Sequence, residues 1–213
     1  LAKICYQIFN KDKKVEGMLL LNHGIFTFAA TAEDSYNRMI KYVTLAENYI
    51  KKCKLKSKKI NTFNKKNNNF DIGKLQNQFR KIYYNITNNK WIIKYHESKD
   101  DVLLSNLKNL KTMFSKGPVT PDHVIRIKSR PLIIDLSKER KENIEKLIIK
   151  SIQKYKDDYS KYFNRNHKYN SSASMLDPYP RLILIKGMGI FATGPSYKEA
   201  KIAMDVGLNS LSV

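Results

Sequence analysis

The hydrophobic pattern near the start of the chain changes from a continuous apolar run to helical spacing. Residues 18–21 are apolar without alternation, which favours a strand buried on both faces. Residues 25–28 resume the extended pattern after a short break. Thr31 and Asp34 then have the spacing of a capping box, which predicts the start of a helix. The apolar stripe of this helix, which we expect to face a core, comprises Tyr36, Met39, Ile40, Val43, Ala46 and Ile50.

Residues 181–213 repeat this strand-turn-helix pattern. When Gly24 is aligned with Gly189, both strand patterns superimpose without a gap. The same alignment places Ser196 and Glu199 in the capping-box positions of the second unit. The chain therefore contains two related units.

The sequence between the two units predicts ordinary helices and strands. Helical spacing is present over residues 72–83, 103–113 and 137–162, and strand patterns over residues 91–95, 124–127 and 132–134. Short buried strands that alternate with amphipathic helices indicate an α/β fold.

A run rich in Lys and Asn, residues 51–70, interrupts the apolar periodicity. Such a segment cannot bury enough apolar surface to order itself firmly. We predict a basic linker over residues 53–70, between a first unit of residues 1–52 and a second of residues 71–213. The alternative, a polybasic arm on RNA or acidic lipid, lacks both interleaved aromatic residues and a helical pattern with one strongly apolar face.

The 213 residues carry a formal net charge of +21, a balance that is typical of nucleic-acid binding. The excess is mostly lysine, which is spread over predicted loops and helix backs, whereas base and phosphate readers favour the planar fork of arginine. Nucleic acid is therefore a disfavoured partner, although a basic nucleic-acid binder stays open as an alternative.

The two cysteines, Cys5 and Cys53, form no CxxC motif and indicate no disulfide framework or zinc knuckle. We expect a cytoplasmic location, since no stretch has the length of a membrane span and the start lacks the pattern of a secretory signal. The chain begins with Leu1 and stops directly after a helical pattern. We expect both ends to be cuts through a larger protein.

The first candidate for chemistry is the histidine of Asn22-His23-Gly24, which interrupts the first apolar strand. Glycine lets the backbone come close to whatever the imidazole touches. His23 could be a hydrogen-bonded core residue or a metal ligand, and both interpretations are open. Its counterpart in the second unit is Met188, a soft ligand that does not build hard zinc sites. Because the repeated frame does not require histidine here, a chemical role is favoured.

The second candidate is a turn-rich run over residues 117–131, beside the strand expected over residues 124–127. Arg126 and Lys128 would lie on one face of this strand and could bind an anion. The alternative is a capped loop in which Asp122 bonds backbone amides. The candidate substrate-binding or anion-binding residues are Asp122, His123, Arg126 and Lys128.

Residues 17–50 resemble the C-terminal part of the class II aldolase/adducin domain, in which an apolar strand ending in Asn-His-Gly precedes a helix starting with Thr-Ala-Glu. The run GPVTPDHVIRIKSRPLI and the terminal residues 181–213 are similar to the fused rhamnulose-phosphate aldolase/short-chain dehydrogenase proteins. The resemblance implies a mostly antiparallel sheet flanked by helices. It also implies that His23 is the third ligand of a catalytic zinc.

By this resemblance, the complete protein would be a zinc-dependent lyase of carbohydrate metabolism, a homo-oligomer that cleaves a sugar phosphate. The family's His-x-His pair and acid/base residue have no match here, so no catalytic residue is assigned, and we expect the chain alone to be inactive. NAD would enter only through a dehydrogenase domain absent from this chain, since no Gly-x-x-x-Gly-x-Gly turn follows a strand. A non-catalytic, adducin-like interaction module is the alternative.

Overall fold

A computed structural model describes residues 1–21, 23–53, 70–118, 120–137 and 139–212. The chain divides into two compact units, Leu1–Asn61 and Thr62–Val213. Of the predicted linker, residues 53–70, only the two end residues belong to the described ranges. The two units are described separately below.

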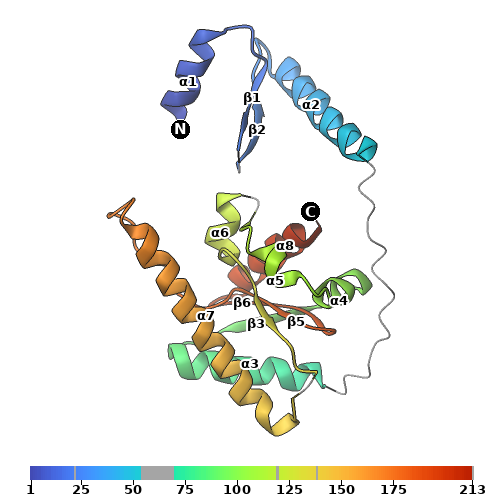
Figure 1. The fold of residues 1–213 in the computed structure, drawn as a ribbon, viewed down its shortest axis with the longest axis vertical. Coiled ribbons are helices and arrows are strands. Elements are labelled where there is room, and N and C mark those ends of the chain that lie inside the picture. Colours follow the sequence, from blue (N-terminus) through green and yellow to red (C-terminus); the bar gives the residue numbers. More distant parts are fainter. Residues whose placement is uncertain (22, 54–69, 119, 138, 213) are drawn as a thin grey trace. The chain divides into compact units, whose positions relative to one another are not determined.

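The first unit is a two-stranded hairpin with a helix on either side of it in the chain (Figure 1). The strands pair antiparallel, with Gly17 opposite Thr27 and Leu20 opposite Gly24. Thr31 accepts a hydrogen bond from the backbone N–H of Asp34 at 3.0 Å, so the predicted helix cap is confirmed. The elements are α1 (Ala2–Lys11), β1 (Gly17–Leu20), β2 (Gly24–Thr27) and α2 (Ala32–Lys52).

No described side chain of this first unit is buried. Leu19 is 71% exposed and Leu21 86% exposed, so the prediction of a strand buried on both faces is wrong. The stripe of α2 is also largely exposed, with Tyr36 and Ile50 among its open residues. The physical reason is that a single hairpin gives each strand only one neighbour, whereas a strand buried on both faces needs packed layers on either side of a larger sheet.

The second unit contains a four-stranded mixed sheet in the order β3-β6-β5-β4. The pairs β3·β6 and β5·β6 are antiparallel, and β4·β5 is parallel. The predicted α/β class, with a mostly antiparallel sheet flanked by helices, is confirmed. Its strands are β3 (Ile92–His96), β4 (Leu132–Ile134), β5 (Leu182–Ile185) and β6 (Gly189–Gly194), and its helices are α3 (Ile72–Thr87), α4 (Lys99–Ser105), α5 (Leu110–Phe114), α6 (Pro121–Ile127), η1 (Lys141–Asn143), α7 (Ile144–His167) and α8 (Tyr197–Ser212).

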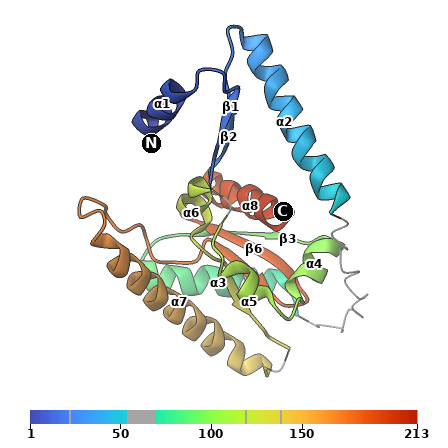
Figure 2. The same ribbon diagram turned by 45° about the horizontal axis from the view of Figure 1, so that its top comes forward.

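Helices cover both faces of this sheet (Figures 1 and 2). The helices α3 and α7 pack with Ile183, Ile185 and Phe191 on one face. On the other face, α6 and α8 pack with Leu184 and Ile190. All four residues of β5 are buried, which explains why its apolar run does not alternate.

Three further predictions of secondary structure need correction. The helix expected over residues 137–162 begins at Ile144, after the short η1, and ends at His167. Residues 124–127 belong to helix α6 rather than to a strand, because Pro121 suits the first turn and Asp122 adds a favourable acidic group there. The helix expected over residues 103–113 is divided into α4 and α5. Ser98 caps α4 by accepting from the N–H of Asp101, which starts this helix earlier than the apolar spacing indicated.

Within the described residues, no helix combines the length and the apolar character needed to cross a membrane.

Candidate functional site

His23 lies on the tight turn that joins β1 and β2. Its backbone N–H donates to the carbonyl of Leu20 at 3.0 Å, and Gly24 follows with a φ of 137°. The side chain of His23 is exposed. This position does not support the interpretation of a hydrogen-bonded core histidine, whereas its role as a metal ligand stays a prediction.

Zinc in a catalytic site takes about three protein ligands and keeps one position open. In the part of the chain that the structure describes, no three His, Cys, Asp or Glu side chains are grouped to hold a metal ion. The described residues therefore do not fit a zinc centre by themselves. His23 can contribute one imidazole to such a centre only if the remaining ligands come from elsewhere.

The turn between β5 and β6 shares two backbone features with the His23 turn. Met188 donates its N–H to the carbonyl of Ile185 at 3.0 Å, and Gly189 follows with a φ of 111°. Met188, however, is only 5% exposed, and its carbonyl accepts from the hydroxyl of Tyr95 at 2.5 Å. The two turns therefore share this hydrogen bond and the positive-φ glycine, but His23 is exposed and Met188 is buried.

The structure places the four predicted anion-binding residues in different environments. Asp122 and Arg126 are exposed on α6, whereas His123 is half-buried and its Nδ1 lies 2.7 Å from the hydroxyl of Thr120. The Nε2 atom of His123 is buried and has no hydrogen-bond partner among the described residues. Because residues 121–127 are helical, Arg126 and Lys128 do not share a strand face, and that prediction is wrong.

Lys128 follows α6 with a φ of 68° and is almost completely buried. Its ammonium group lies 3.5 Å from the carboxylate of Asp177 and 5.0 Å from the centre of the Tyr159 ring. Burial lowers the pKa of Lys128, because desolvation disfavours its charged form, and the charge of Asp177 opposes this effect. Lys128 therefore takes part in an internal charge network.

This network continues through Asp177 to Arg181 at 2.7 Å, and the guanidinium of Arg181 lies 4.7 Å from the centre of the Trp91 ring. Two cations thus share one carboxylate, and two aromatic rings supply further contacts. A non-glycine residue with positive φ, such as Lys128, is an uncommon conformation that surrounding contacts must stabilise.

A histidine-carboxylate pair at the end of β3 was not predicted. Nδ1 of His96 lies 2.8 Å from the carboxylate of Asp101, which also accepts from the hydroxyl of Ser98 at 2.7 Å. The spacing of Ser98 and Asp101 is that of a capping box and could have revealed the pair. Asp101 is buried, whereas the side chain of His96 is 43% exposed. Pairing of this kind orients an imidazole ring.

Residues 73–213 match the family described as "Aldolase class II, second domain". This match covers most of the chain and nearly all of its second unit, so the chain belongs to the class II aldolase family.

The chain is also similar to the "Uncharacterized oxidoreductase YuxG" of Bacillus subtilis (strain 168), with 27% identity over 221 residues. The alignment covers 95% of this chain and spans 30% of the length of that relative. No solved structure matches the chain.

Proposed function

We propose that this chain is part of a class II aldolase that cleaves a ketose phosphate of the rhamnulose 1-phosphate type. The observation that carries the proposal is the family match over residues 73–213, and the exposed histidine on the hairpin of the first unit adds to it. The similarity to a longer protein named as an oxidoreductase supports a fusion with a short-chain dehydrogenase domain outside this chain. NAD would bind to that domain.

In this proposal, the role of His23 is to hold zinc together with ligands from outside the described residues. Zinc acts as a Lewis acid that polarises a carbonyl oxygen of the substrate. What this chain contributes is one imidazole on a glycine-supported turn, where the side chain is open to solvent. No described residue is assigned as catalytic acid or base. We propose that the complete protein assembles as a homo-oligomer.

A non-catalytic, adducin-like interaction module is the second candidate function. It is favoured by the lack of a three-ligand group among the described residues and by the apolar Met188 in the equivalent turn. The two candidates differ in whether the complete protein binds zinc through His23.

The test uses the full-length protein that contains this chain. Zinc content is measured by elemental analysis, and cleavage of rhamnulose 1-phosphate is followed by trapping the aldehyde product. We expect His23→Ala to lose bound zinc and turnover together. The matched control is Met188→Leu, a volume-conserving change at the equivalent turn, which should keep both within about twofold.

Full zinc content and full turnover in His23→Ala would contradict the assignment of His23. The absence of zinc and turnover in the unaltered full-length protein would favour the interaction module. We also expect the isolated chain to show no turnover with added zinc, and robust cleavage by it would overturn the incomplete-site interpretation.

A further inference from the structure

A pocket of about 580 Å³ lies in the second unit between α7 and the segments on either side of α6. Its walls come from residues 114–118, from Ser129 and Arg130 after α6, and from one side of α7. Several segments distant in sequence therefore converge on one space. The volume is within the range of small-molecule sites, about 300–1,000 Å³.

The charges around this pocket are strongly unbalanced. Four cationic side chains line it, and Asp158 is the only carboxylate among its described lining residues. Arg130 donates to Asp158 at 2.9 Å, and Lys154 from outside the pocket shares the same carboxylate. The lining cations for which the described residues provide no ion-pair partner are Lys116, Lys161 and Arg165.

Three tyrosines of α7 supply the other part of the wall. Tyr155 donates its hydroxyl to the carbonyl of Arg130 at 2.7 Å, which holds the segment after α6 against the helix. The hydroxyls of Tyr159 and Tyr162 have no hydrogen-bond partner in the described part of the chain. Their rings lie 6.0 Å apart. These two tyrosines can therefore offer both hydrogen bonds and apolar ring surface to a ligand.

Lys128 adds positive charge behind this wall, because its ammonium lies 5.0 Å from the centre of the Tyr159 ring. Its partner Asp177 is shared with Arg181, so among these three residues there is one more cation than anions, and Lys128 itself is buried. A fixed buried charge is screened less by salt than an exposed one. The wall is therefore positive both on its surface and beneath it.

The geometry points to a binding site for a small phosphorylated ligand in this pocket. Arg130, Lys161 and Arg165 would contact phosphate oxygens, for which guanidinium groups are well suited. The hydroxyl of Tyr159 would bond a ligand oxygen next to the phosphate. The described lining residues include no histidine or cysteine, so this site is distinct from the proposed zinc chemistry.

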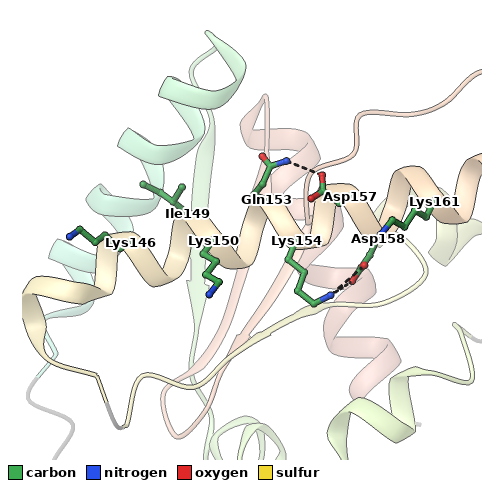
Figure 3. A pocket seen from close by; sticks show the side chains of 8 residues that line it. All are labelled: Lys146, Ile149, Lys150, Gln153, Lys154, Asp157, Asp158 and Lys161. Atoms are coloured by element: carbon green, nitrogen blue, oxygen red, sulfur yellow. Dashed lines mark hydrogen bonds and ion pairs between the residues drawn. The ribbon is translucent and has the colours of Figure 1, made fainter.

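The outer face of α7 provides a contrast within the same helix (Figure 3). There a surface hollow is lined by residues of α7 alone, with Lys146 and Lys150 pointing away from the helix (Figure 3). Asp158 and Lys161 line both this hollow and the pocket. Charges on one exposed helix face lack the surrounding walls that desolvate and orient a small ligand. An extended polyanion such as RNA would contact both surfaces, whereas a small phosphate ester would depend on the pocket between α7 and the segments beside α6.

The test is isothermal titration calorimetry of the chain in EDTA, with inorganic phosphate, fructose 1-phosphate and AMP as separate probes. We expect at least one phosphate ester to bind with submillimolar affinity. Arg165→Gln should weaken this binding at least about tenfold, since it removes a charged hydrogen bond. Lys150→Gln is the matched control on the outer face of α7 and should change the affinity less than about twofold.

Tyr159→Phe is the second variant, because it removes the hydroxyl and keeps the ring. It should weaken an ester probe more than inorganic phosphate. Unchanged Trp91 fluorescence would show that each variant remains folded. The proposal is overturned if no probe binds below 1 mM (about −4.1 kcal/mol), or if Lys150→Gln weakens binding as much as Arg165→Gln. Preferred binding of a duplex RNA, weakened equally by both variants, would also overturn it.

Because EDTA removes zinc, these outcomes are independent of the aldolase proposal. If the chain binds a phosphate ester but the full-length protein shows no turnover, the phosphate-site proposal stands and the aldolase proposal fails. If turnover depends on His23 but no ligand binds in the pocket, the aldolase proposal stands and the phosphate-site proposal fails.

Discussion

The two hairpin-helix units have the same local frame but opposite degrees of burial. In both, the turn closes with one backbone hydrogen bond of 3.0 Å and is followed by a glycine with positive φ. Thr31 and Ser196 cap the following helices in the same way. Yet β5 is buried along its whole length, whereas β1 contains no buried residue.

The difference shows that the local structure of each unit, its turn and helix cap, and the burial of its strands have separate causes. Turn geometry and helix caps arise from residues close in sequence. Burial of β5 needs β4 and β6 beside it and the helices α3, α7, α6 and α8 over its two faces. The first unit has the same frame, but its hairpin stands alone as a sheet. Matched substitutions in the two units can test this separation.

The largest difference is expected between Phe191→Ala and Phe26→Ala, at aligned positions. Phe191 is fully buried, with its ring centre 5.5 Å from that of Phe79, so its truncation should destabilise the second unit by about 3–5 kcal/mol. Phe26 is 36% exposed, and its loss should cost below about 1 kcal/mol.

Urea unfolding followed by Trp91 fluorescence measures the second unit, since Trp91 is the single tryptophan of the chain. Hydrogen exchange of peptides from β1 and β2 measures the first. Equal effects of the two truncations would contradict the difference in burial.

The next comparison is Gly189→Ala against Gly24→Ala. Both glycines have positive φ, but a Cβ on Gly189 would lie 2.7 Å from the carbonyl oxygen of His96, whereas nothing lies within 4 Å of one on Gly24. We expect Gly189→Ala to destabilise its unit by about 3 kcal/mol, since strain adds to a backbone clash, and Gly24→Ala by about 1 kcal/mol. The same two measurements apply, and a smaller effect at Gly189 than at Gly24 would refute this explanation.

Exchanging the turn residues gives a smaller effect. Met188→His places an imidazole in a buried site and should destabilise the second unit by about 1–3 kcal/mol. His23→Met changes an exposed side chain, so it should alter the free energy of unfolding of the first unit by less than about 0.5 kcal/mol. Thermal unfolding of both variants at pH 8, where imidazole is mostly neutral, provides the comparison. A stable Met188→His variant would show that the turn itself accepts either residue in either unit.

The helix caps should behave alike in both units, because they depend on local geometry alone. Thr31→Ala and Ser196→Ala each remove the acceptor for one backbone N–H, at 3.0 Å from Asp34 and 3.2 Å from Glu199. Each should cost about 1 kcal/mol. Hydrogen exchange in the first turns of α2 and α8 would report the loss. Thr31→Ser and Ser196→Thr keep the hydroxyl and serve as controls. A tenfold difference in hydrogen-exchange rate between the two alanine variants would contradict the explanation that both caps depend on local geometry alone.

The smallest effect concerns an ion pair beside the second turn. Asp135 lies 3.2 Å from Lys186, which occupies the position equivalent to the exposed Leu21. Hydrogen bonding from Ser137 and the charge of Lys186 lower the pKa of Asp135. Its contribution is therefore present above the unfolded pKa of about 3.9 and is lost as pH falls through the lower folded value.

Asp135→Asn should accordingly be less stable than the unaltered chain at pH 6, within the roughly 0–1 kcal/mol of exposed ion pairs, and the difference should shrink below about pH 4. Urea unfolding over this pH range checks it, with Asp157→Asn on the outer face of α7 as control. A difference that grows towards low pH would contradict the sign of the pKa shift.

Local features of both units could be predicted from the sequence. The apolar runs, the glycine after each turn and the capping residues predicted strands, turns and helices close to those observed. The strand expected over residues 124–127 failed because Thr120 and Pro121 start a helix there. The candidate site was harder, since the pocket beside α7 joins Arg130 to Arg165 across 35 positions, and no local pattern encodes such a meeting.

The sequence by itself therefore determined the repeated hairpin-helix frame, the helix caps and the exchange of His23 for Met188, because these depend on short-range geometry and residue type. Only the tertiary structure decided that Met188 is enclosed, that Lys128 pairs with Asp177, and which cations surround one pocket. The reason is that burial and electrostatic environment are properties of packed layers, whose contacts join residues far apart in the chain.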